Sequence, residues 1–318
     1  MTPELLILGQ VTVDHVVPAR PGPWTVQVGG NALYAAAGAR LVLDARRVGV
    51  VSRVGDTILG EVRALLDGAG LPPEGIAPSP LEPMTEWLLY EEDGSRRALP
   101  RLAALLDPAL DEAGRRAAYF AHLEAVSPSL EDVPPEWRGA RAVHLAPQIR
   151  ARHEATLRGL AAEPCRVSVD PSPHYTRALD EAGLAALLRR ADMLLPSLAE
   201  VAHLAPDQDW AALLLRLRRA GLREVALKRG ADGALLLAED SEGPVEVPAA
   251  PAAVADLTGA GDAFCGAYAA RRLQGDGPVE AARRAAVAAA LVIEARGAGA
   301  ALALPREAAE ARWRAARG

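Results

Sequence analysis

Short apolar runs alternate with helix-like segments through the second half of the chain, and this alternation constrains the fold more than any other feature. The runs at 142–145, 166–169 and 193–195 are separated by segments at 152–162 and 178–190 that have helical character. Strands joined through helices of this length return to the same sheet edge and therefore run parallel. The pattern predicts a doubly wound α/β domain with a mostly parallel central sheet.

The first half of the chain adds a second β-type feature. Segments 85–90 and 96–99 are rich in strand-forming residues and flank Asp93-Gly94, a pair that is typical of hairpin turns. We expect this hairpin to be a small piece appended to the main sheet. No low-complexity linker divides the 318 residues, so we predict one domain, 1–318. Segment 101–136 is predicted as helices and loop, and a polar tail follows a helix at 279–295.

Composition excludes several classes of partner and location. Acidic residues outnumber basic ones 41 to 35, which argues against nucleic-acid binding. Two cysteines cannot build a disulfide framework, and no apolar run approaches the ~20 residues needed to cross a membrane. The N-terminus lacks the basic segment of a secretory signal, so a cytoplasmic protein is expected. Of the 35 basic residues only Lys228 is a lysine, which makes this position conspicuous.

The segment Asp256-Leu257-Thr258-Gly259-Ala260-Gly261-Asp262-Ala263-Phe264 carries the clearest chemical signal. Its glycines allow a ligand to approach the backbone closely, and a helix opens directly behind them. The N–H groups of Gly259, Ala260 and Gly261 would form an anion site at the positive end of that helix. A carboxylate at the same place, Asp262, is suited to accept a proton from a hydroxyl that attacks phosphorus.

This segment, with four others in matching order, resembles the ribokinase-like, or PfkB, carbohydrate kinases. The signature of that family is D-T-x-G-A-G-D, close to 256–262. Further resemblance is found at 29–36, which holds a Gly-Gly pair, and at 48–60, 191–200 and 225–233. The resemblance implies a three-layer α/β/α ribokinase-like domain with a small β lid, whose strands fall within 11–28 and 84–100.

The same resemblance implies an ATP-dependent kinase that transfers the γ-phosphoryl group to a hydroxyl of a small sugar or polyol. Asp262 would be the catalytic base and Gly259–Gly261 the anion hole. Mg²⁺ would act with ATP, Glu200 binding it through water. The implied substrate-binding residues are Asp14, Gly29, Gly30, Asn31 and Tyr34, and the implied nucleotide-binding residues are Ser197, Lys228, Gly230, Gly233, Asp256 and Thr258.

The sequence departs from the family pattern at three of the quoted positions. Tyr34 stands where many members have an Asn that binds sugar hydroxyls, which argues against the common ribose pattern. Ser197 replaces the Asn of N-x-x-E, and Thr57 replaces a frequent Asp. These changes leave the base and the anion hole in place, so the prediction of an active enzyme stands.

Two other functions remain as alternatives. A nucleoside kinase of the same fold would use the same pocket for a nucleoside. A non-catalytic nucleotide-binding regulator is disfavoured, because a pure binder gains nothing from Asp262 beside a phosphate site. The substrate, the hydroxyl that is phosphorylated, the oligomeric state and dependence on a monovalent cation stay open. The exposed face of the lid is a candidate homodimer surface.

Overall fold

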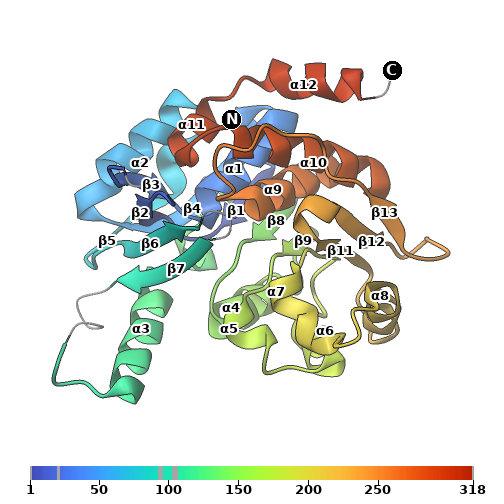
Figure 1. Ribbon diagram of the computed structural model, residues 1–318, viewed down its shortest axis with the longest axis horizontal. Helices are drawn as coiled ribbons and strands as arrows, with labels where there is room; N and C mark the ends of the chain where they lie inside the picture. Colours follow the sequence, from blue (N-terminus) through green and yellow to red (C-terminus); the bar gives the residue numbers. More distant parts are fainter. Residues whose placement is uncertain (1, 20–21, 92–95, 102–106, 317–318) are drawn as a thin grey trace.

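The computed structural model describes residues 2–19, 22–91, 96–101 and 107–316. A nine-stranded sheet runs through the molecule in the order β13-β12-β11-β10-β9-β8-β1-β4-β5 (Figure 1). All neighbours from β11 to β5 pair in parallel, while β12 and β13 add an antiparallel edge. The strands are β1 Leu5–Leu8, β4 Val48–Gly55, β5 Ile76–Ser79, β8 Ala142–Leu145, β9 Arg166–Val169, β10 Met193–Leu194, β11 Glu224–Lys228, β12 Ala234–Leu237 and β13 Val245–Val247.

Helices cover both faces of this sheet, which gives the expected three layers (Figure 1). Strand β1 shows why: Leu5 and Ile7 pack into one buried cluster, and Leu6 and Leu8 pack into the other. A strand buried on both faces is apolar throughout, as parallel strands usually are. The helices are α1 Asn31–Val42, α2 Asp56–Gly68, α3 Glu112–Val126, α4 Arg150–Gly159, α5 Pro173–Thr176, α6 Glu181–Leu187, α7 Leu198–Val201, α8 Trp210–Arg219, α9 Ala260–Leu273, α10 Pro278–Glu294, α11 Gly297–Ala303 and α12 Arg306–Ala315.

A second sheet of four strands lies beside the main one and has the order β3-β2-β6-β7 (Figure 1). Strand β2 pairs antiparallel with β3 and parallel with β6, and β6 pairs antiparallel with β7. We call these four strands the lid sheet. They are β2 Thr12–Val17, β3 Thr25–Gly29, β6 Met84–Tyr90 and β7 Arg96–Arg101. The Asp-Gly turn predicted between β6 and β7 lies outside the described residues.

The chain end and two strands differ from the sequence prediction. The region expected to be a polar tail forms α11 and α12, which bury Ala301, Leu302 and Trp313 against the main core. Alanine-rich helices give little contrast between apolar and polar faces, so their pattern reads as polar. The short strands β5 and β13 were not predicted, because β5 contains Pro78 and β13 spans only Val245–Val247.

Helices α1 and α9 cross at very short range, and two glycines make this contact feasible. A Cβ atom at Gly266 would lie 1.9 Å from the carbonyl oxygen of Ala35, and one at Gly38 would lie 2.0 Å from that of Ala263. Both obstacles are backbone atoms, which cannot rotate away. The crossing therefore fixes the start of α9 against α1.

Gly266→Ala is expected to lower the free energy of unfolding by about 1–3 kcal/mol, because the added methyl group overpacks this crossing. The urea midpoint of the purified protein measures the change. Gly60→Ala is the matched control, since Gly60 also lies inside a helix but has nothing within 4 Å of an added Cβ atom. That variant should be neutral or more stable by roughly 0.5–1 kcal/mol. An equal loss in both variants would contradict the close crossing.

Candidate active site

The loop before α9 and the first turn of that helix form the predicted anion site. Gly259 caps α9 in the left-handed conformation, with φ 79°, and a Cβ atom there would lie 2.1 Å from the Tyr34 ring. Ala260 and Gly261 begin the helix, so their N–H groups lack acceptors within it. The amide of Ala260 has a long contact of 3.4 Å with the carbonyl oxygen of Leu257. The arrangement suits a bound anion.

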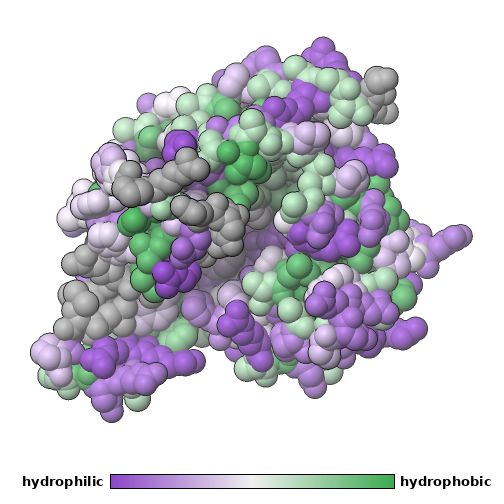
Figure 2. All heavy atoms as spheres, viewed as in Figure 1, coloured by the Kyte–Doolittle hydropathy of each residue, from purple (hydrophilic) through white to green (hydrophobic). Residues whose placement is uncertain are grey.

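Asp262 completes the first turn of α9 and is partly exposed. It therefore lies at the same helix start as the anion site, as the motif predicts. Figure 2 shows the surface hollowed between the lid sheet on one side and α6 and α7 on the other. A hydroxyl-bearing molecule bound beside this turn would have a carboxylate within one helical turn of the phosphate site.

Asp256 and Thr258 hold the loop together and join it to the lid sheet. The Asp256 carboxylate accepts a 2.8 Å hydrogen bond from the Thr258 amide and a second, short one from the Tyr90 hydroxyl. The same hydroxyl lies 2.5 Å from Oγ1 of Thr258. Tyr90 is the last residue of β6, so one lid strand ends on the loop. Sequence reasoning missed Tyr90, because nothing local marks an aromatic residue at a strand end as a long-range partner.

Asp14 lies on the lid strand β2 with only 3% of its surface exposed. Its Oδ1 atom accepts a 2.6 Å hydrogen bond from the Thr12 hydroxyl. A Cβ atom at Gly29 would lie 1.9 Å from Asp14 Oδ2, so the glycine gives this carboxylate its room. Gly30 has φ 106° and caps α1, with Gln10 O 2.4 Å from the place of a Cβ atom. These predicted substrate residues are thus neighbours.

Asn31 lies at the start of α1, but backbone groups engage both ends of its amide. Its Oδ1 accepts from the Gln10 amide at 2.8 Å, and its Nδ2 donates to Pro147 O at 2.9 Å. In this state Asn31 ties together the segments that follow β1 and β8. The observed contacts are those of a scaffold at the carboxyl edge of the sheet.

Lys228 forms a buried cluster with two residues that sequence reasoning did not assign to the site. Its Nζ atom lies 2.5 Å from Asp170 Oδ2 and 3.2 Å from Cys265 Sγ. The Cys265 thiol in turn lies 3.3 Å from the same carboxylate oxygen. Asp170 follows β9, and Cys265 lies one turn beyond the anion site in α9. An isolated acid after a strand end was the available signal for Asp170.

Electrostatics keep Lys228 an ammonium and Cys265 a thiol, while burial makes the Asp170 carboxyl harder to ionise. Burial lowers the pKa of Lys228, but the groups beside it, Asp170 foremost, together outweigh that effect and the pKa ends above its ordinary value. Burial raises the pKa of Asp170 to about 7, against the opposing effect of Lys228 and with Glu200 and Asp262 adding to the rise. Burial also raises the pKa of Cys265 well above its ordinary value, so its sulfur stays protonated.

Ser197 and Glu200 form a capping box at the start of α7. The Oε2 atom of Glu200 accepts a 2.6 Å hydrogen bond from the Ser197 amide and a short one from its hydroxyl. The backbones of Ser197 and Lys228 form an isolated parallel β-bridge. The capping box therefore lies next to the buried cluster. The predicted Gly230 and Gly233 flank a tight turn between β11 and β12, with φ 62° and 76°.

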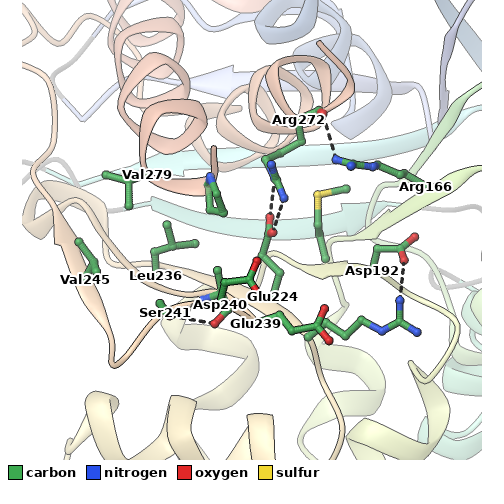
Figure 3. A pocket seen from close by; sticks show the side chains of 14 residues that line it. Arg166, Asp192, Glu224, Leu236, Glu239, Asp240, Ser241, Val245, Arg272 and Val279 are labelled. Carbon is green, nitrogen blue, oxygen red and sulfur yellow. Dashed lines mark hydrogen bonds and ion pairs between the residues drawn. The ribbon is translucent and has the colours of Figure 1, made fainter. Parts of the chain in front are cut away.

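A cleft of about 490 Å³ lies at the amino ends of β9, β10 and β11, at the opposite edge of the sheet (Figure 3). Its charged groups largely pair with one another. Arg272 contacts Glu224 at 2.8 Å and Arg223 lies 3.5 Å from Asp192. None of the residues that line this cleft belongs to the loop or the first turn of α9, so it is separate from the candidate active site.

Comparisons with known proteins agree with the fold. The pfkB family carbohydrate kinase model matches residues 6–304. A 2-dehydro-3-deoxygluconokinase of Escherichia coli K12 is 42% identical over 99 residues, which make up 30% of each chain. The chain thus spans about a third of the length of the curated relatives it matches.

Two solved structures share the fold over almost the whole chain. The nucleoside kinase of Burkholderia thailandensis in complex with inosine has a TM-score of 0.75 at 18% identity, covering 98% of this chain and 96% of the other. The ribokinase of Arabidopsis thaliana complexed with ribose and ATP has a TM-score of 0.71 at 20% identity, covering 98% and 99%. Among the residues described, no helix has the length and apolar character needed to cross a membrane.

Proposed function

The chain belongs to the pfkB family of carbohydrate kinases, and from this premise we propose that it transfers the γ-phosphoryl group of ATP to a hydroxyl of a small sugar or polyol. The observation that carries the proposal is the first turn of α9, where helix-start amides without acceptors inside the helix and the Asp262 carboxylate occur together. Either feature alone is common at helix starts. Their combination suits transfer of a phosphoryl group to a hydroxyl.

Asp262 accepts the proton of the acceptor hydroxyl as its oxygen attacks the γ-phosphorus. The new O–P bond forms while the bond to the β-phosphate oxygen breaks, and ADP leaves. The amides of Gly259, Ala260 and Gly261 donate to the negative charge that is spread over the transferred group. The crossing of α1 and α9 holds these donors in place before the reaction, so they need little rearrangement.

A Mg²⁺·ATP complex would contact the protein mainly through water. Within the described residues no group of three or more His, Cys, Asp or Glu side chains is arranged to hold a metal. Mg²⁺ commonly keeps several waters and uses few carboxylates together with substrate phosphates. Glu200, 9% exposed and fixed by Ser197, would hold that water shell. The bound ion would neutralise phosphate charge.

The acceptor would bind between Asp14 and the first turn of α9, under the lid sheet. A buried carboxylate that already accepts one hydroxyl hydrogen bond, from Thr12, is suited to accept others from a polyol. A nucleoside is the second candidate acceptor, because the nucleoside kinase named above binds inosine on a fold with a TM-score of 0.75. Lys228, Gly230 and Gly233 would lie on the nucleotide side.

The test is a screen of sugars, sugar acids, polyols and nucleosides with Mg²⁺·ATP, in which ADP release is followed by a coupled assay. The proposal expects ADP release that depends on one class of acceptor and a phosphorylated product that mass spectrometry detects. The Asp262→Asn variant is the negative control, because it lacks the proposed catalytic base. ADP release independent of every acceptor, and equal in this variant, would contradict the proposed function.

We also propose that the outer face of the lid sheet joins two copies of the chain. Cross-strand pairing places Asp14 on the inner face, while His15 and its neighbours Val26 and Trp87 share the outer one. The His15 ring stacks there on Trp24 and Trp87, and the three ring centroids lie 4.8–5.4 Å apart. Trp24 and Val26 remain 51% and 54% exposed, as expected of an apolar face that a partner covers.

Val26→Glu is expected to shift the protein from dimer to monomer at micromolar concentration, because a carboxylate would be buried in an apolar contact. Sedimentation equilibrium gives the mass of both proteins. Val245→Glu serves as control, since Val245 is an exposed strand residue of β13, in the other sheet. A wild-type protein that sediments as a monomer of 33.3 kDa would refute the lid dimer.

A further inference from the structure

The contacts of Lys228 use only part of its hydrogen-bonding capacity. An ammonium group carries three N–H donors in a tetrahedral arrangement. One is directed to Asp170 Oδ2 at 2.5 Å and another to Cys265 Sγ at 3.2 Å. The side chain is 11% exposed, so the remaining donor needs a partner close to the protein surface.

Gly261 lies beside the end of the Lys228 side chain. A Cβ atom built on Gly261 would be 3.5 Å from Lys228 Nζ and 3.7 Å from the Cδ and Cε atoms. The missing side chain leaves a gap between the ammonium and the first turn of α9. That gap opens on the anion site, because Gly261 is itself one of the helix-start residues with an outward amide.

We propose that Asp170 and Cys265 are positioning residues that aim the Lys228 ammonium past Gly261 at the phosphoryl group being transferred. The inference rests on the proposed kinase function and adds two residues to its site. Asp170 supplies the negative charge that lets an ammonium stay buried, and Cys265 fixes the direction of a second N–H. A planar guanidinium is larger and spreads its charge, which fits the presence of the chain's only lysine here.

A purely structural ion pair is the competing explanation, and a double variant separates the two. Lys228→Met or Asp170→Asn alone leaves an unpaired buried charge and should destabilise the fold. Combining both removes both charges, so the unfolding midpoint should recover toward wild type. The positioning role predicts that function does not recover with it, because no ammonium then faces the phosphoryl group.

The experiment measures binding of the ATP analogue AMP-PNP and of ADP, each with Mg²⁺, by calorimetry. Wild type should prefer AMP-PNP, since only this ligand carries a γ-phosphoryl group. Lys228→Met should lower AMP-PNP affinity roughly tenfold to hundredfold, the value of a charge-assisted hydrogen bond, and change ADP affinity little. Asp170→Asn should act in the same direction, and the double variant should match Lys228→Met. Cys265→Ala should lower the preference more weakly, with recovery in Cys265→Ser.

Two results would overturn the inference. One is an unchanged ratio of AMP-PNP to ADP affinity in Lys228→Met; the other is a double variant that regains both stability and the wild-type ratio. Neither depends on turnover, so they are distinct from failure of the proposed function, which the acceptor screen detects. A wild-type protein that binds neither nucleotide would overturn both proposals. Gly261→Ala, whose methyl group fits at 3.5 Å but fills the gap, should fold normally and lower the same ratio.

Discussion

Asp262→Asn should lower kcat by roughly 10²–10⁴-fold, the usual contribution of general-base assistance. Asparagine has the same size as aspartate and keeps the first turn of α9, so the fold should survive. It cannot accept the proton of the attacking hydroxyl. ATP affinity should stay near wild type or rise, because a negative group beside the phosphates is removed.

Calorimetry and a coupled assay on one preparation separate these effects. More than about a tenth of the wild-type kcat would refute the general-base role. Loss of ATP binding together with rate would instead make Asp262 a residue that holds the loop or the metal. Equal unfolding midpoints of variant and wild type are the required control for an intact α9.

For Asp14→Ala the expected result is a KM for the acceptor that is higher by roughly tenfold to hundredfold, with little change in the KM for ATP. The carboxylate is 3% exposed, and its Oδ2 atom lies where a side chain at Gly29 would otherwise be. Hydrogen bonds to a buried charged group are among the stronger ones in proteins, which sets the size of the effect. The Thr12 hydroxyl alone cannot replace them.

Initial rates with each substrate varied in turn measure both constants. Thr12→Val removes the hydroxyl that donates to Asp14 Oδ1 and should give a smaller change in the same direction. If Asp14→Ala raises both constants equally, Asp14 supports the fold rather than the acceptor. A change confined to the KM for ATP would show that Asp14 does not bind the acceptor.

The sequence predicted the fold best where a strand is buried on both faces. The bounds of β8 and β9 match the predicted runs, because a short, nearly continuous apolar stretch admits few alternatives. Helix ends moved by a few residues, as at α6, since capping residues such as Asp180 and alanine-rich turns blur them. The helices after residue 295 were not predicted, because their buried side is largely alanine.

The candidate site was predictable only where it is local in sequence. Gly259 to Asp262 form one turn, so their proximity follows from the motif itself. Asp170 and Lys228 are 58 positions apart, and Tyr90 and Asp256 are 166 apart. Such pairs depend on strand order and on how the lid sheet sits, which local patterns do not encode. The contact between Lys228 and Cys265 was not predictable for the same reason.

Under the proposed function, the bond between Tyr90 and the loop would make the acceptor and the nucleotide heterotropic effectors of each other. Strand β6 cannot lift from the loop without breaking the hydrogen bonds to Asp256 and Thr258. An acceptor that favours the lowered lid therefore favours the ordered loop, and a nucleotide that orders the loop favours the lowered lid. Reciprocity then requires each ligand to change the affinity of the other by the same factor. The acceptor and the nucleotide would then bind cooperatively to a single polypeptide. The ternary complex would be well populated at substrate concentrations at which either substrate alone would leave most of the protein unbound.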